Sequence, residues 1–225
     1  MKKVIVTGAS RGIGRAIAQM FFEKGYIVYA NYKNTPIDYA CTKAVYADVS
    51  VQSDVAKMHE QIGEVDIVIN NAGIAQEKLF CDITENDWDN MINTNLKSVF
   101  TNTKAFLPNM LKNHSGCIIN ISSIWGLDGG AMEVHYAASK AGVIGITKAL
   151  SQEVAPSGVR VNAIAPGVID TDMTAVYTAE EREVLLQRTD LRCIGKPLDI
   201  AHTALYLAEN EFITGQVIEV SGGFR

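Results

Sequence analysis

The chain has 225 residues, of which 48% are hydrophobic and 20% charged, and its formal net charge is −5. This composition excludes a disordered chain, and the length favours one domain with one core over two. A net negative charge gives no general attraction to nucleic acid or to anionic membranes, so we predict neither as a partner. No apolar segment reaches the roughly 18 residues that a membrane-spanning helix needs.

Short apolar segments alternate along the chain with longer amphipathic ones. The short segments are rich in valine and isoleucine without strict alternation, as in parallel strands that are buried on both faces. We predict strands at residues 3–7, 26–31, 43–48, 65–70, 117–122, 159–165 and 216–220. We predict helices at residues 12–24, 51–62, 84–112 (as two helices), 136–155, 179–188 and 197–208. This alternation predicts an α/β fold, a single doubly wound parallel sheet of about seven strands, with residues 1–225 as one domain.

Helix boundaries and cysteine usage allow three smaller predictions. Gly25 follows the first predicted helix as a C-terminal cap, and Ser50 precedes the second as an N-cap. The four cysteines are widely spaced, and the four histidines share no metal-ligand spacing with them. We therefore predict free thiols, no metal and a reducing, cytoplasmic location. The apolar run at residues 4–6 is too short for a signal peptide.

The first predicted strand leads directly into TGASRGIGRA, which carries glycines at 8, 12 and 14. Glycine lets the backbone turn sharply and approach a pyrophosphate closely, and the following helix N-terminus offers N–H groups and a positive dipole. A glycine triplet alone is weak evidence, but its place between a buried strand and a helix predicts a dinucleotide site.

A tyrosine lies four residues before a lysine at three places in the chain. The pairs are Tyr29–Lys33, Tyr39–Lys43 and Tyr136–Lys140. This spacing on a helix would put the phenol and the ammonium on one face. The first two pairs fall in or beside predicted strands, so spacing alone does not decide which pair is chemical.

With its G-x-x-x-G-x-G spacing, the sequence resembles the short-chain dehydrogenase/reductase family. Further motifs follow in that family's order: NNAG at 70–73, NTN ending at Asn95, ISS ending at Ser123, the pair Tyr136–Lys140, APGVIDT at 165–171 and ITGQVIEVSGG at 213–223. This order selects Tyr136–Lys140 over the other two pairs. The resemblance implies an enzyme that exchanges hydride with a ketone or alcohol carbon.

The resemblance also implies the catalytic set Asn95, Ser123, Tyr136 and Lys140. Tyr136 would protonate the developing alkoxide, and Ser123 would polarise the carbonyl. The charge of Lys140 is expected to lower the tyrosine pKa from its usual value of about 10. Asn95 would hold a water that links Lys140 to solvent.

The implied cofactor is NADP(H), with NAD(H) possible. No acidic residue ends the second strand, where Asn31 stands, and Arg11 and Lys33 could reach a 2′-phosphate or could be solvated surface cations. The predicted cofactor-binding residues are Gly8, Ser10, Arg11, Gly12, Ile13, Gly14, Asn31, Lys33, Asp48, Val49, Asn71, Ala72, Gly73, Tyr136, Lys140, Pro166, Gly167, Val168, Ile169 and Thr171. The segment KNTPIDYACT contains a proline and is too short for a full crossover helix, so we predict a loop or a single turn there.

Two substrate classes are compatible with the sequence. The overall pattern resembles 3-oxoacyl-acyl-carrier-protein reductases, although Lys112 and Arg160 are the only cations at the places where relatives meet the acidic carrier. The stretch SSIWGLDGGAMEVHY is similar to the branch that reduces the 5-aminopentanone group on elongation factor P. Trp125 and Glu133 would then bind a cationic amine, or Trp125 could be core and Glu133 solvated.

A third interpretation is a regulator that binds NADPH without turnover, although such a binder would not need the catalytic set. In relatives, residues 171–193 cover the substrate as a mobile segment. In relatives two long helices, which correspond to residues 94–112 and 136–155 here, pack into a four-helix interface that makes dimers and tetramers. The resemblance therefore implies a homo-oligomer.

Overall fold

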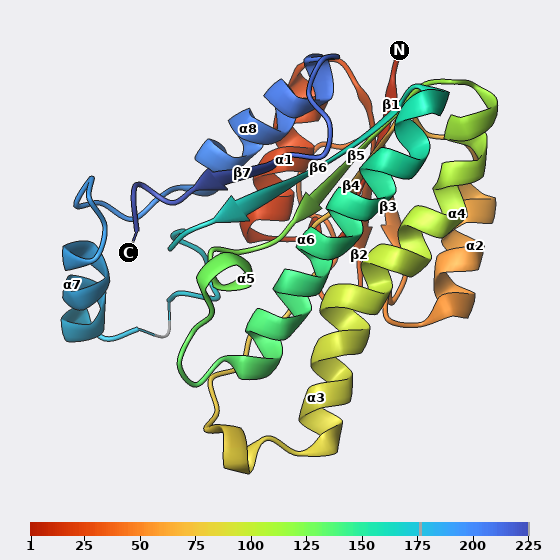
Figure 1. Cartoon of the computed structure of the whole chain (residues 1–225). Helices are drawn as coiled ribbons and strands as arrows, with labels where there is room; N and C mark the ends of the chain where they lie inside the picture. The colour runs from red at the N-terminus through yellow and green to blue at the C-terminus, as the bar shows by residue number, and fades with distance from the viewer. Residues whose placement is uncertain (176, 225) are drawn as a thin grey trace.

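The structure, a computed structural model, describes residues 1–175 and 177–224. Its strands form one parallel sheet in the order β3-β2-β1-β4-β5-β6-β7 (Figure 1). They are β1 (Lys3–Val6), β2 (Ile27–Tyr32), β3 (Lys43–Tyr46), β4 (Ile67–Asn70), β5 (Gly116–Ile121), β6 (Val159–Pro166) and β7 (Val217–Val220). The chain order reverses between β1 and β4, so the crevice at the carboxyl ends of these strands is where a doubly wound sheet binds ligands.

Helices cover both faces of the sheet. They are α1 (Gly12–Glu23), α2 (Gln52–Ile62), α3 (Glu85–Ile92), α4 (Ser98–Lys112), α5 (Trp125–Asp128), α6 (Val134–Val154), α7 (Ala179–Gln187) and α8 (Pro197–Glu209). Short 3-10 turns lie at Phe80–Asp82 and Ala155–Ser157, and a π-helical turn, η2, spans Asn93–Lys97. The apolar residues of α1 and α8 form one core with the sheet, and those of α2, α4 and α6 form the other.

The predicted seven-stranded parallel sheet is confirmed, and the strands and long helices lie within a few residues of their predicted bounds. The segment after β2 is a loop, as predicted. One cap was wrong: α2 begins after Val51, whose side chain makes no capping hydrogen bond. Ser50 instead donates its hydroxyl to Asp48, 2.6 Å away, because an aspartate two residues earlier offers a stronger local acceptor. All four cysteines are free thiols.

The predicted helix at residues 84–112 is a continuous run in which η2 joins α3 to α4. A π turn inserts an extra residue into the helical ladder and often marks a functional position. Here it turns Asn95 into the protein, where the residue is 1% exposed.

A network of buried amides joins the sheet to the helices beneath the carboxyl ends of β4 and β5. Asn70 donates to Asn120 (2.8 Å) and accepts from Asn102 of α4 (2.7 Å). Asn120 in turn donates to Thr147 of α6 (2.9 Å). Because buried amides are costly unless they are paired, this network fixes the positions of α4 and α6 relative to the strands. None of the helices in the described part of the chain is long and apolar enough to cross a membrane.

The glycine-rich turn packs directly onto the end of β4. A Cβ on Gly8 would lie 2.8 Å from the Cα of Ala72, and one on Gly14 would lie 2.3 Å from the carbonyl oxygen of Gly8 and 2.4 Å from Nδ2 of Asn71. Gly8 also has a φ of 62°, in the left-handed region. These positions therefore require glycine for space and for conformation.

We expect Gly14→Ala to destabilise the protein by about 1–3 kcal/mol, because the methyl group would displace main chain that has no room to move. Gly145→Ala in α6 is the matched control, since a Cβ there meets nothing within 4 Å. The control should be neutral or stabilising by up to about 1 kcal/mol. Urea unfolding of both variants checks this prediction, and equal stability of the two would contradict it.

Candidate active site

The four predicted catalytic residues come from three elements that meet beyond the carboxyl end of β5. Ser123 lies two residues after β5 ends, and Tyr136 and Lys140 lie one turn apart near the start of α6. Asn95 reaches the same place from η2. Ser123, Asn95 and Lys140 are 7%, 1% and 4% exposed, so the set is enclosed by protein on most sides.

Lys140 is buried with little compensation for its charge. Its Nζ donates to the carbonyl oxygen of Ile121 at 2.9 Å and lies 5.7 Å from the centre of the Tyr136 ring. Burial lowers the pKa of Lys140 to about 8. The ammonium is therefore easily lost, which is what a proton-conducting site requires.

Tyr136 departs from the expectation drawn from the sequence. Burial raises its pKa to about 12, a hydrogen bond with the Ser123 side chain opposes this, and the charge of Glu133 adds to the rise. The shift is therefore opposite to the lowering expected from Lys140, because desolvation of the phenolate outweighs the hydrogen bond with Ser123. At neutral pH the phenol stays protonated and is ready to donate.

Asn95 is held by main chain on both sides of its amide. Its Oδ1 accepts from the N–H of Ile74 (2.8 Å), and its Nδ2 donates to the Ile74 carbonyl (2.9 Å) and to Ser139 (3.1 Å). A Cβ on Gly73 would lie 3.3 Å from Asn95 Oδ1 and 3.5 Å from Lys140 Nζ. Gly73 thus lies between the two residues, and its lack of a side chain leaves the space that separates them open.

The glycine turn is shaped to receive a pyrophosphate. The Thr7 hydroxyl accepts from the N–H groups of Asn71 (3.0 Å) and Ala72 (3.1 Å), which locks the end of β4 to the turn. A Cβ on Gly12 would lie 3.3 Å from Thr171, so the residue at the start of the 171–193 segment closes over the turn. The predicted cofactor residues that follow β1, β4 and β6 therefore lie close together, and they fit a dinucleotide.

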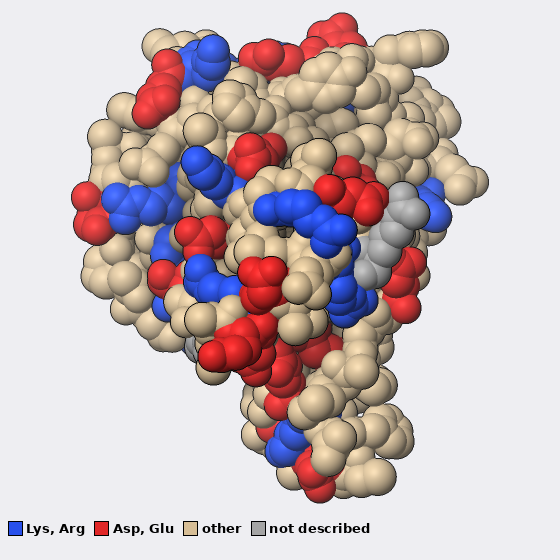
Figure 2. Space-filling model, turned by 90° about the vertical axis from the view of Figure 1, so that its left-hand side faces the viewer, with Lys and Arg blue, Asp and Glu red and all other residues tan. Residues whose placement is uncertain are grey.

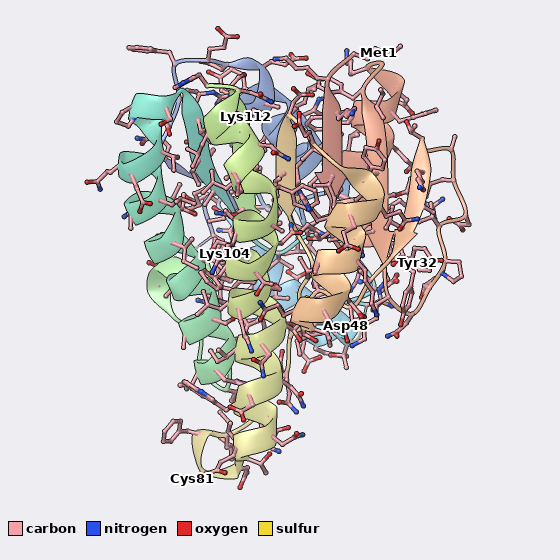
Figure 3. All side chains as sticks on the ribbon, turned by 90° about the vertical axis from the view of Figure 1, so that its right-hand side faces the viewer. Met1, Tyr32, Asp48, Cys81, Lys104 and Lys112 are labelled. Carbon is pink, nitrogen blue, oxygen red and sulfur yellow. The ribbon has the colours of Figure 1, made fainter. Side chains whose placement is uncertain are left out.

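Three predicted cofactor residues near the ends of β2 and β3 have polar partners within the protein. Asn31 is 2% exposed; it accepts from the N–H of Gly8 (3.2 Å) and donates to the carbonyl of Ala47 (3.1 Å), so it supports the turn from behind. Lys33 pairs with Asp48 at 2.6 Å. Burial alone would raise the pKa of Asp48, but hydrogen bonds from Lys33 and Ser50 outweigh it and lower that pKa. Figure 3 shows Asp48 near Tyr32, at the opposite end of the sheet from Met1.

Sequence reasoning missed the role of the loop that replaces the crossover helix. Tyr39 donates its hydroxyl to the carbonyl of Ala9 in the glycine turn (2.7 Å), and the Arg15 guanidinium lies 5.0 Å from the Tyr39 ring centre. Arg15 also pairs with Asp38 (2.8 Å). The loop therefore braces the glycine turn, and an Arg on α1 joins Arg11 and Lys33 as a cation near this end. The only sequence signal was an arginine one helical turn after Arg11.

Glu133 immediately precedes α6 and is 7% exposed. Its Oε2 is buried without a hydrogen-bond partner. Burial, with a contribution from the charge of Glu77, raises its pKa to about 7. Glu77 accepts from the hydroxyl of Tyr177 (3.0 Å), which lies in the 171–193 segment. Glu133, Glu77 and Tyr177 thus form one group, of which Glu133 acts on Tyr136, and the sequence had indicated only Glu133.

Two residues that the sequence assigned to substrate or carrier have structural partners. The Trp125 ring contacts Phe224 edge-on (5.4 Å between ring centres), and the Arg188 guanidinium lies 5.8 Å from the Trp125 centre. Arg160 donates to the carbonyls of Leu207, Ala208 and Ile213 at 2.8–3.1 Å. Trp125 therefore packs against the C-terminal segment, and Arg160 binds the end of α8 and the residues after it. On the face that carries α7, acidic and basic side chains are intermingled (Figure 2).

Comparison with known proteins gives a consistent result. A family model described as "short chain dehydrogenase" matches residues 2–182. The chain is 41% identical over 239 residues to the 3-oxoacyl-[acyl-carrier-protein] reductase FabG of Staphylococcus aureus (strain Mu50 / ATCC 700699), covering 99% of this chain and 97% of the relative. It is 38% identical over 235 residues to the protein of that name from Vibrio harveyi, covering 99% and 96%.

Among solved structures, the chain matches the crystal structure of 3-oxoacyl-[acyl-carrier protein] reductase from Brucella melitensis ATCC 23457. The TM-score is 0.93 at 32% identity, and the match covers 99% of this chain and 91% of the other. The enclosed serine, tyrosine and lysine, the glycine turn that fits a dinucleotide and these matches over nearly the full length lead to one conclusion. The chain belongs to the short-chain dehydrogenase family and is an oxidoreductase that uses a nicotinamide cofactor.

Proposed function

We propose that this protein is an NADPH-dependent carbonyl reductase that acts on 3-oxoacyl thioesters, in the manner of the relatives' named activity. The convergence of Ser123, Tyr136, Lys140 and Asn95 in one enclosed site carries this proposal. The near-complete coverage of the FabG relatives supports the substrate class. We also infer that the protein is cytoplasmic and forms a homo-oligomer, as the resemblance implies.

Each catalytic side chain has a role that its surroundings support. Ser123 hydrogen-bonds Tyr136, so both side chains can face one carbonyl oxygen, with Ser123 polarising it and Tyr136 donating the proton. The raised pKa of Tyr136 keeps that proton in place until negative charge develops on the substrate oxygen. Lys140 then stabilises the phenolate, and Asn95, next to Lys140 across Gly73, lies on the route by which the proton is replaced.

NADPH would supply the hydride. The glycine turn and the start of α1 would hold its pyrophosphate, and Thr171 would cover it. For the 2′-phosphate, Arg11, Arg15 and Lys33 are the nearby cations, and each is paired with an exposed or half-buried aspartate. The pairs of Arg11 and Arg15 use aspartates whose side chains are 71% exposed, and such surface pairs contribute little, so the phosphate can displace these two aspartates. The pair of Lys33 is more enclosed, because the Asp48 side chain is 18% exposed.

A second candidate substrate is favoured by one observation, the unpartnered carboxyl of Glu133. An ionised carboxylate buried beside Glu77 gains from a cationic partner, and a ketone that carries an amine would provide one. The 5-aminopentanone group on elongation factor P has this chemistry. Trp125 no longer supports that candidate, because its ring packs against Phe224 and Arg188.

We expect the purified protein to consume NADPH with a short 3-oxoacyl thioester and to turn over more slowly with NADH. Tyr136→Phe should lower kcat at least about 100-fold because the general acid is lost, with NADPH affinity unchanged. The decrease in NADPH absorbance measures kcat, and a titration followed by NADPH fluorescence measures the affinity for NADPH. NADPH binding without turnover of any ketone by the wild type would instead indicate a non-catalytic binder.

The pH dependence should follow Lys140. Its pKa in the folded protein is lowered to about 8, so the cation is present below that pH and lost above it. We therefore expect kcat/KM for NADPH, which reports the free enzyme, to fall as the pH rises through about 8. Lys140→Arg, whose guanidinium stays protonated, should work more slowly and lack this decline. The same alkaline decline in the variant and in the wild type would rule Lys140 out as its source.

The second candidate makes a separate prediction at Glu133. If an amine-bearing ketone is the substrate, Glu133→Gln should raise KM for it by about 10-fold or more, since a charge-assisted contact contributes about 1.5–3 kcal/mol. KM for a neutral 3-oxoacyl thioester should not rise. Glu153→Gln, at an exposed carboxylate near the C-terminal end of α6, is the matched control. An unchanged KM for the amino-ketone would remove this candidate.

A further inference from the structure

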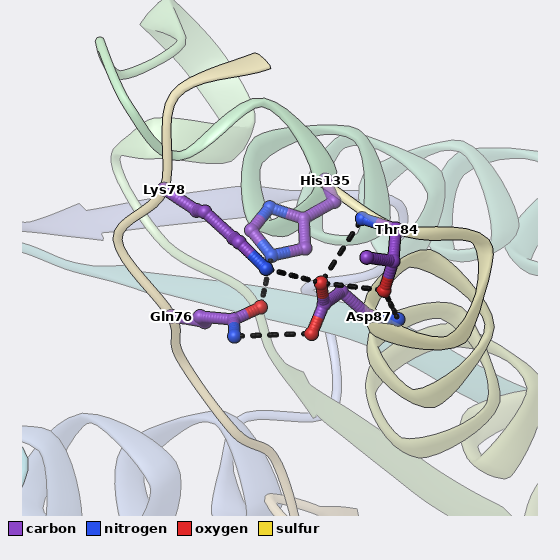
Figure 4. Close-up of polar contacts among 5 residues, drawn as sticks. All are labelled: Gln76, Lys78, Thr84, Asp87 and His135. Carbon is purple, nitrogen blue, oxygen red and sulfur yellow. Dashed lines mark hydrogen bonds and ion pairs between the residues drawn. The ribbon is translucent and has the colours of Figure 1, made fainter. Parts of the chain in front are cut away.

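A chain of polar side chains links α3 to the residue that precedes Tyr136. Asp87 of α3 accepts from Gln76 Nε2 (3.2 Å), and Gln76 Oε1 lies 2.9 Å from Nε2 of His135 (Figure 4). The other oxygen of Asp87 accepts from Lys78 (2.7 Å) and from the hydroxyl of Thr84 (2.7 Å). These hydrogen bonds hold the pKa of Asp87 well below its usual range.

The direction of every hydrogen bond in this chain follows from Asp87. An ionised carboxylate can only accept, so Gln76 must turn its NH₂ group toward Asp87 and its oxygen toward His135. The ring nitrogen Nε2 of His135 must then carry the hydrogen. The other ring nitrogen, Nδ1, is buried without a partner, and an unpaired lone pair there is less costly than an unpaired N–H.

His135 is 0% exposed, and burial lowers its pKa, so its ring stays neutral in this position. Asp87 raises that pKa and Lys78 lowers it, so the two charges of the pair oppose each other. The tautomer of His135 is therefore set by Gln76 and does not depend on an added proton.

The start of α6 depends on contacts from outside the helix. Its N-cap residue, Glu133, makes no side-chain capping hydrogen bond, so the first turn lacks the usual local closure. That turn carries Tyr136. Two hydrogen bonds join this first turn and the residues before it to the loop after β4. One links the His135 ring to Gln76, and in the other the N–H of Lys78 donates to the carbonyl of Met132 (2.7 Å).

We propose that Asp87, acting through Gln76, fixes His135 as its Nε2–H tautomer and thereby positions the first turn of α6 and the hydroxyl of Tyr136. Asp87, Gln76 and His135 are positioning residues, and this inference rests on the proposed reductase activity. It adds residues of α3 and of the loop after β4 to a site whose reacting groups lie on η2, β5 and α6.

The test reverses the polarity of the chain and then restores it. In Asp87→Asn, the new NH₂ group can donate to Gln76, which turns and offers its own NH₂ to His135. We expect the hydrogen of His135 to move to Nδ1, seen in the ¹⁵N spectrum of the histidine rings. We expect kcat to fall about 10-fold, because small displacements of a reacting group are costly, while KM for NADPH changes little.

The double variant Asp87→Asn/Gln76→Glu has the wild-type net charge and restores the pattern. The carboxylate introduced at position 76 can accept both from the amide introduced at position 87 and from His135, so the Nε2–H tautomer and most of kcat should return. Asp89→Asn, an exposed aspartate on the same helix, is the control for charge and should resemble the wild type. If Asp87→Asn does not fold, Gln76→Met removes both hydrogen bonds without touching the cap of α3 and should lower kcat similarly.

Three results would overturn the proposal: an Nδ1–H tautomer in the wild type, a changed tautomer with wild-type kcat, or no recovery in the double variant. Failure of the proposed function gives a different pattern. The wild type would then turn over no 3-oxoacyl thioester. The ¹⁵N spectra of the histidine rings, and the ¹³C signal of the Tyr136 Cζ atom that carries the hydroxyl, would still change in Asp87→Asn and return to the wild-type values in the double variant. Loss of that response would count against the positioning role itself.

Discussion

The site depends on burying the ammonium group of Lys140. A buried cation is tolerated only where polar groups meet it, and here the carbonyl at the end of β5 does so while most of the desolvation cost remains, which lowers the pKa to about 8. The backbone must approach closely for this to happen. Gly126 provides such an approach, since a Cβ there would lie 2.7 Å from the main-chain carbon of Lys140. The same enclosure raises the pKa of Tyr136 and leaves its proton available for transfer.

Keeping these groups together requires rigid support, and the molecule supplies it with buried polar networks. The asparagine network under β4 and β5 fixes α4 and α6 against the sheet. The chain from Asp87 to His135 fixes the first turn of α6 from the other side. Paired buried polar groups hold one geometry strongly because any other leaves a group unsatisfied. Apolar packing, by contrast, tolerates small shifts.

The loop after β4 connects these parts. Three consecutive side chains, Gln76, Glu77 and Lys78, contact α6, the 171–193 segment and α3 in turn. A substrate entering beside Tyr136 would therefore meet a surface whose geometry depends on all three elements. Glu133 adds to that surface a carboxyl oxygen, Oε2, without a hydrogen-bond partner, and its raised pKa of about 7 makes its charge sensitive to a ligand bound beside it.

The sequence by itself determined the sheet, the helices and the glycine turn, because strands buried on both faces, helical periodicity and turn glycines are local patterns. The order of the family motifs pointed to Asn95, Ser123, Tyr136 and Lys140 as a predicted set, and the fold brings these residues together. It also predicted a loop or a single turn after β2, from the shortness of that segment and its proline. Only the tertiary structure decided the contacts of Asn31, Trp125 and Arg160, because their partners lie far away in the chain. Asn31 supports the glycine turn, Trp125 contacts Phe224, and Arg160 binds carbonyls at and after the end of α8. The direction of the Tyr136 pKa shift likewise depends on burial, which only the folded chain creates.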